Sequence, residues 1–157
     1  LGPYANFYFE SYETMKAQIQ EMLHIEKGGD EQLKDELAAY NPLVPKGKEL
    51  VATLMFEIDN PLSRAEFLNK IGVIEEKIFL KIGEEKIKSI PEQDVDRTSA
   101  EGKASSVQFI HFEFTNDQIS KFKDLSNEIL IGIDHEMYVH TTKLNDNTKQ
   151  ALALDFI

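Results

Sequence analysis

The chain of 157 residues contains no cysteine and no tryptophan. Without cysteine it can form no disulfide, hold no thiolate-bound metal or iron–sulfur cluster of its own, and use no cysteine nucleophile. Arginine is also scarce, with only Arg64 and Arg97 among 17 basic residues. Because 28 acidic residues give a formal net charge of -11, the chain repels phosphate backbones. We therefore expect no nucleic-acid partner.

Long apolar runs and specific catalytic motifs are missing as well. No run approaches the roughly 20 residues of a membrane-spanning helix, and no basic segment followed by an apolar stretch indicates a signal peptide. We therefore expect no membrane partner and a cytoplasmic location. The sequence has no Gly-rich phosphate loop, no nucleophile elbow and no His-Glu-x-x-His motif, so it does not establish an enzyme. Because the chain starts at Leu1 without Met, we expect that an upstream segment has been removed.

The first part of the chain has the pattern of a helical hairpin. Residues 11–27 place their apolar side chains within one arc at about 100° per residue, which is typical of an amphipathic helix. Gly28 and Gly29 end it, and Asp30 can cap a second helix through Tyr40. The following loop holds two prolines, which disfavour helix. The dense aromatic residues before the first helix either dock a ligand or fasten the terminal segment onto the core.

The rest of the chain alternates between strand and helix patterns. We expect a surface loop at 91–105. Period-two alternation and turn residues predict strands at 50–58, 77–82, 85–90, 107–114, 129–133 and 137–142, and helices at 62–71, 115–127 and 146–157. This order predicts a single α+β domain over residues 1–157, with the helical hairpin and proline loop of residues 1–47 packed on a largely antiparallel sheet of five or six strands within residues 48–157, together with further helices.

The strand at 107–114 carries two chemically active side chains. Alternation puts His111 and Glu113 on the face that does not hold Ile110 and Phe112. If the strands are neighbours, these residues and others near strand ends form a non-thiolate site for a divalent metal, or a general-base pair. The alternative is a hydrogen-bonded sheet histidine beside carboxylates on a solvated face. The candidate metal ligands are Glu57, His111, Glu113 and His135.

The hairpin offers a second candidate site. Glu21 and His24 have the Glu-x-x-His spacing of a di-iron helix, but the apolar arc predicts that His24 points to solvent. Polar residues flank this arc, and the loop that follows the second helix is stiff. We interpret this region as a ligand or partner surface formed by Gln18, Glu21, Glu26, Tyr40, Asn41 and Pro42.

Several segments, in this order along the chain, carry a family resemblance. They are Phe9-Glu10 with Thr14, Gln18, Glu21-Met22 and Ile25-Glu26; Glu36-Leu37 with residues 40–45; residues 50–55 with Glu57; the strand at 107–114; and residues 132–135 with Tyr138. On these segments the chain resembles an uncharacterised bacterial domain family whose genes tend to lie beside those for rubrerythrin-like and iron-sulfur oxidoreductase-like proteins. The resemblance implies a setting in intracellular redox or peroxide defence, with a rubrerythrin-like or iron-sulfur protein as partner.

The chain also departs from that family's pattern. The family has an upstream basic helical segment, Arg in place of His24, His in place of Gln108 and Arg in place of His111. These departures favour Glu21, Glu26, Glu57 and His135 as site residues.

Three hypotheses follow. The first is an accessory binding protein of redox metalloproteins. The second is a small metal-binding protein or metal-dependent enzyme. The third is a small-molecule pocket walled by Tyr12, Met15 and Phe109.

Overall fold

The computed structural model describes residues 1–93 and 98–157 and has an α+β fold. Within these residues, the strands form two antiparallel four-stranded sheets. Sheet A has the order β1-β2-β6-β5, and sheet B has the order β4-β3-β7-β8. The strands are β1 (Ala5–Glu10), β2 (Glu49–Phe56), β3 (Ile78–Ile82), β4 (Glu85–Lys88), β5 (Ile90–Pro91), β6 (Val107–Glu113), β7 (Ile129–His135) and β8 (Tyr138–Lys143).

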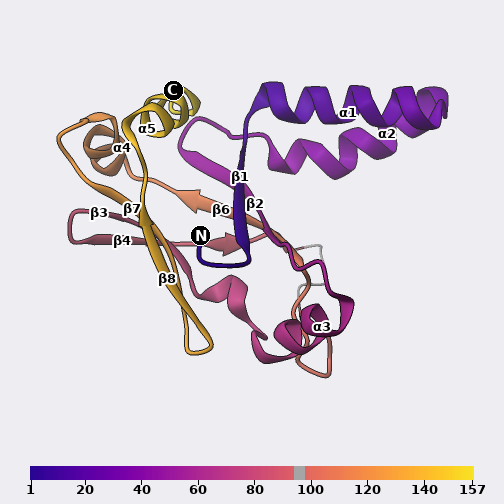
Figure 1. Ribbon diagram of the computed structural model, residues 1–157. Coiled ribbons are helices and arrows are strands. Elements are labelled where there is room, and N and C mark those ends of the chain that lie inside the picture. Colours follow the sequence, from indigo (N-terminus) through magenta and orange to yellow (C-terminus); the bar gives the residue numbers. More distant parts are fainter. Residues whose placement is uncertain (94–97) are drawn as a thin grey trace.

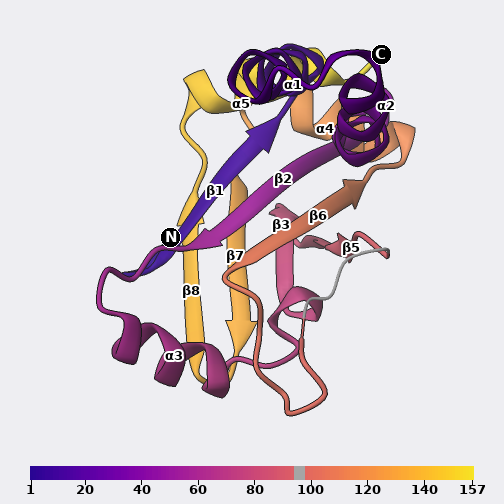
Figure 2. The ribbon, with the colours of Figure 1, turned by 90° about the vertical axis from the view of Figure 1, so that its right-hand side faces the viewer.

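The hydrophobic core lies between the two sheets, and Figure 2 shows sheet A in front of sheet B. Alternate residues of β2 and β6 point inward, because successive side chains of a strand face opposite sides. Leu50 and Leu54 on β2, Ile110 and Phe112 on β6 and Leu80 on β3 have no exposed surface. Burying a side chain of this kind contributes about 1.5–3 kcal/mol, so these inner-face residues stabilise the packing of the two sheets.

Helices lie at both ends of the sheets. The helix α3 (Pro61–Lys70) is at one end, and α4 (Asn116–Lys123) and α5 (Asp146–Leu152) are at the other (Figures 1 and 2). Three rings, of Phe114, Phe122 and Phe156, pack edge to face beside α4, with centroids 4.8–5.7 Å apart. The chain also forms short 3-10 helices at η1 (Asn41–Leu43), η2 (Ile74–Glu76) and η3 (Ala153–Asp155). Among the described residues, no helix has the length and apolar content to cross a bilayer.

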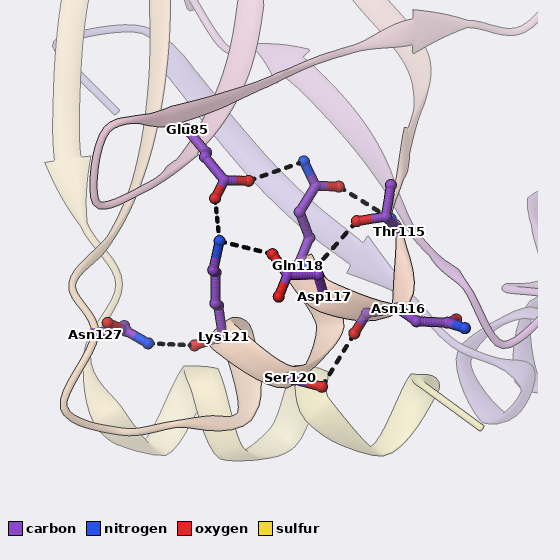
Figure 3. A network of polar contacts seen from close by, with 8 residues as sticks. All are labelled: Glu85, Thr115, Asn116, Asp117, Gln118, Ser120, Lys121 and Asn127. Atoms are coloured by element: carbon purple, nitrogen blue, oxygen red, sulfur yellow. Dashed lines mark hydrogen bonds and ion pairs between the residues drawn. The ribbon is translucent and has the colours of Figure 1, made fainter.

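A polar network around Lys121 ties α4 to β4 (Figure 3). The Lys121 ammonium lies 2.7 Å from the Asp117 carboxylate and also contacts Glu85. Gln118 Nε2 donates a hydrogen bond of 3.4 Å to the same Glu85. The hydrogen bonds that Lys121 donates to Asp117 and Glu85 raise its pKa. The first turn of α4 is fixed in addition by a capping box, in which the side chains of Thr115 and Gln118 each accept from the other's backbone N–H.

A buried lysine holds α5 against the segment that leads from α4 into β7. Lys149 is 1% exposed, and its ammonium donates to the carbonyl oxygens of Leu125 at 3.2 Å and Asn127 at 2.6 Å. Burying a charged group is costly unless it is hydrogen-bonded. These bonds therefore make Lys149 a structural residue of the core.

The two N-terminal helices project from the sheets as a helical hairpin, α1 (Tyr12–Glu26) and α2 (Gly29–Tyr40) (Figures 1 and 2). A capping box formed by Ser11 and Thr14 starts α1. Lys27 ends it in the left-handed conformation, with φ of 56°. The hairpin meets the outer face of sheet A through a small second cluster, in which Met15, Leu43 and Val51 are buried and Tyr40, Val44 and Phe109 pack against them.

The predicted α+β class and the N-terminal helical hairpin are confirmed. The strands are divided between two sheets, whereas the sequence predicted one sheet of five or six strands. One added strand is β1, which pairs with β2 over its whole length. In this strand Ala5, Phe7 and Phe9 face the core, while Asn6 and Tyr8 are exposed. The density of aromatic residues concealed this pattern.

Candidate functional site

Three of the four predicted metal ligands, Glu57, His111 and Glu113, lie on the outer face of sheet A, opposite the core. On β6, residues 108, 110 and 112 are buried, whereas residues 107, 109, 111 and 113 are half-buried or exposed. This is the division between faces that alternation predicted. His111 lies opposite Val51 of β2, and Glu113 lies opposite Glu49. The outer face therefore carries a polar end next to the hairpin.

His111 is held between two carboxylates at this end. Its Nδ1 lies 3.0 Å from Glu49 Oε2, and its Nε2 lies 2.9 Å from Glu92 Oε2. The side chains of His111 and Glu49 are only 12% and 11% exposed, and that of Glu92 is 24% exposed. A doubly protonated imidazole can donate to both oxygens, whereas a neutral ring can donate to only one. The cluster of Glu49, His111 and Glu92 thus joins β2, β6 and the chain that follows β5.

The sequence did not identify the two partners of His111. Glu49 directly precedes the predicted strand, and continuing the alternation of that strand by one residue places it on the same face as Val51. Glu92 falls in the segment predicted to be a surface loop, and no local pattern brings it to His111. The pairing of β5 with β6, which puts Ile90 opposite His111, makes this contact. A cross-strand contact of this kind depends on tertiary structure.

Glu113 and Glu57 lie at opposite ends of sheet A. Glu113 is exposed and lines a pocket of about 340 Å³ together with Lys46, Lys48 and Glu49. Glu57 follows the end of β2, where it accepts a hydrogen bond from Asn6 and lies 3.4 Å from the Tyr8 hydroxyl. Both carboxylates are therefore on a solvated face, as the alternative interpretation of the sequence described.

His135 belongs to the other sheet. Its Nε2 lies 3.2 Å from the carbonyl oxygen of Gly72, and its Nδ1 accepts from the backbone N–H of Met137 at 3.2 Å. The strands β2 and β6 are neighbours, as a shared site required, but β7 is not in their sheet. The structure therefore does not bring the four predicted metal ligands together. Over residues 1–93 and 98–157, no group of three or more His, Asp or Glu side chains is arranged to hold a metal ion.

The predicted partner surface lies along the hairpin. Gln18, Glu21 and Glu26 are exposed on α1, and His24 is exposed as its position in the apolar arc predicted. One residue missed by the sequence analysis is Gln32, whose Nε2 donates to the Met22 carbonyl and to the Glu26 carboxylate, both at 3.1 Å. At the other end of α2, Tyr40 and Pro42 are half-buried and Asn41 is exposed. These residues cover the length of the hairpin and do not converge on one pocket.

Comparisons with known proteins give a family without an assigned activity. A crystal structure of a novel protein of unknown function from Burkholderia pseudomallei K96243 is similar, with a TM-score of 0.90 and 34% sequence identity. The similarity covers 100% of this chain and 82% of that chain. A search of curated proteins found no significant match. The family model described as "Protein of unknown function (DUF3501)" matches residues 1–156. The chain therefore belongs to this family.

Proposed function

We propose that this protein is a cytoplasmic accessory binding protein whose helical hairpin docks on another protein. The observation that carries the proposal is that α2, a helix of 12 residues, has no buried residue. Isolated helices of this length are marginal in water, and in proteins the burial of an apolar face supplies most of their stability. The apolar side chains of α2 stay partly exposed to solvent, so the helix can bury them against a partner protein.

Exposed apolar side chains on the hairpin support this proposal. Ile25 of α1 is 62% exposed, and Leu37 of α2 is 36% exposed. Aliphatic side chains in such positions can become the buried centre of an interface. The only residues of α1 that are buried are Met15 and Ile19, in its first half. The second half of α1 is therefore available for docking.

The charge of the hairpin indicates the character of the partner. Residues 12–40 contain seven acidic residues and three lysines, which leaves a net charge of -4. Complementary charge increases the rate of association and fixes the orientation of a complex. We therefore propose a partner with a basic docking surface. The family resemblance suggests its class, a rubrerythrin-like or iron-sulfur protein of redox or peroxide defence, and the hairpin would supply contact rather than chemistry.

Purified components test this proposal. The candidate partners are rubrerythrin-like and iron-sulfur proteins, the class that the family resemblance suggests, each titrated into the full chain by isothermal calorimetry. We expect Ile25→Ser, and separately the double reversal Glu21→Lys with Asp35→Lys, to weaken binding about tenfold, or ~1.4 kcal/mol. Leu62→Ser and Glu66→Lys are the matched controls, because both residues are exposed on α3 at the other end of the molecule. The controls should bind like the parent chain.

Two results would contradict the proposal. One is binding that is weakened equally by the α1–α2 variants and the α3 controls, since docking would then not be located on the hairpin. The other is the absence of binding to every candidate partner at protein concentrations up to about 1 mM, which corresponds to roughly 4 kcal/mol of binding free energy.

A further inference from the structure

A pocket of about 390 Å³ lies where the root of the hairpin meets the C-terminal helices. In both ribbon views, the start of α1 lies next to α5 (Figures 1 and 2). The last residues of β1 and the first residues of α1 form one wall, and α5 with η3 forms the other. The lining includes Phe9, Glu10, Tyr12, Glu13, Leu154 and Asp155. The pocket therefore combines apolar surface with three carboxylates.

None of these carboxylates pairs with a cation within the described part of the chain. Glu10 accepts hydrogen bonds from two neutral hydroxyls, Thr53 Oγ1 at 2.7 Å and Thr14 Oγ1 at 2.9 Å. Those bonds fix the position of the carboxylate and leave its charge in place. Burial raises the pKa of Asp155, because partial removal from water disfavours its charged form. A cation that enters the pocket would relieve this cost.

The apolar walls of the pocket are open to solvent. Tyr12 is 60% exposed and Leu154 is 83% exposed. The Tyr12 ring already attracts one cation, since Lys16 Nζ lies 5.8 Å from its centroid, near the outer limit of a cation–π contact. An incoming side chain can therefore cover apolar surface with its stem and place its charge among the carboxylates.

We propose that this pocket receives an arginine side chain of the protein that docks on the hairpin. The inference rests on the proposed function and adds the residue that the partner contributes. Arginine fits this lining better than lysine does, because its planar guanidinium can stack on an aromatic ring and carries five N–H donors for carboxylate oxygens. Together with the acidic hairpin, the pocket gives one docking surface that selects for a basic partner.

The first test uses a defined probe with the full chain. The blocked tripeptide Gly-Arg-Gly is titrated into 15N-labelled protein, and the blocked tripeptide with citrulline at its centre serves as a neutral control of the same shape. We expect shifts confined to the pocket with the arginine peptide, and none with the citrulline peptide. Asp155→Asn should weaken the arginine peptide about fivefold. Asp146→Asn, which removes an exposed charge from the start of α5, should leave its affinity unchanged.

Three results would overturn the inference: shifts spread over other acidic surfaces such as α3, an equal loss for Asp155→Asn and Asp146→Asn, or a lysine peptide that binds as tightly as the arginine peptide.

The titration of the full chain with the candidate partners separates this inference from the proposed function. If Ile25→Ser weakens the partner and Asp155→Asn does not, docking on the hairpin stands and the pocket assignment fails. If the arginine peptide binds in the pocket and no candidate partner binds, the pocket stands and the proposed function fails.

Discussion

The two-sheet core and the helical hairpin bury their apolar side chains to different extents. The inner faces of sheets A and B exclude water from whole side chains, and Leu50, Phe112 and Ile133 have no exposed surface. In the hairpin, α1 has two buried residues, Met15 and Ile19, and α2 has none. Both regions have amphipathic sequences. The difference indicates that stability is concentrated in the sheets, and that the apolar surface of the hairpin remains available for a partner.

Truncating one apolar side chain in the core and one in the hairpin should give the largest difference in the free energy of unfolding. We expect Phe122→Ala to reduce the free energy of unfolding by about 3–5 kcal/mol, because a fully buried ring is replaced by a cavity. Leu37→Ala in α2 should cost less than about 1 kcal/mol, because its side chain is already partly in water. Urea unfolding followed by circular dichroism measures both values. Similar losses for the two variants would show that the hairpin is part of the cooperative core.

A pair of lysines sharpens the comparison. Lys149→Met should reduce the free energy of unfolding by about 2–3 kcal/mol, because two buried carbonyl oxygens lose a charged donor. Lys34→Met removes the same charge from the exposed face of α2, and its effect should stay within about 0.5 kcal/mol. If Lys149→Met were neutral in the same urea experiment, the two hydrogen bonds that hold α5 would have little energetic weight.

Substitutions of two histidines, His111 in sheet A and His24 on α1, should give the next largest difference in stability. His111→Leu should cost about 2 kcal/mol, because Glu49 and Glu92 lose the polar ring whose two nitrogens lie within hydrogen-bond distance of their carboxylates. His111→Arg should recover part of this loss, since a guanidinium can also donate to two carboxylates. His24→Leu on the exposed side of α1 is the control and should leave the thermal midpoint nearly unchanged. Equal midpoints for His111→Leu and His111→Arg would contradict a hydrogen-bonding role for the ring.

The smallest effect concerns pH and Asp155. Since burial raises the pKa of Asp155 in the folded state, its contribution to stability is fully present below the ordinary aspartate pKa and is lost as pH rises through the raised value. Asp155→Asn should therefore increase the urea midpoint slightly at pH 7, and this gain should disappear on acidification. Asp35→Asn in α2 serves as the exposed control. A gain for Asp155→Asn that is independent of pH would exclude desolvation as its cause.

Local patterns were sufficient to predict most elements of the fold. Period-two alternation indicated β2 and β6, and glycines and capping residues located the ends of α1 and α2 within a few residues. Two features were not predicted. The aromatic composition of residues 4–9 concealed the alternation of β1. The division into two sheets depends on which strands pair, and pairing is decided by long-range packing that no single segment encodes.

The candidate site was less accessible to sequence reasoning than the fold. The face of His111 could be predicted, but its partners could not, because Glu92 reaches it only through the pairing of β5 with β6. His135 was grouped with His111 on the basis of residue type, and the two lie in different sheets. Strand periodicity fixes the side of a sheet on which a residue lies. It does not fix which residues meet across strands.

Hydrogen exchange of the backbone amides, measured with and without the basic partner, tests the central claim most directly. In the free protein we expect amides of α2 to exchange through local opening at a much lower free energy than those of β2. When the partner binds, protection should rise in α1 and α2 and remain unchanged in α3. An α2 that is already as protected as β2 in the free protein, or partner binding that leaves α2 unchanged, would contradict the account.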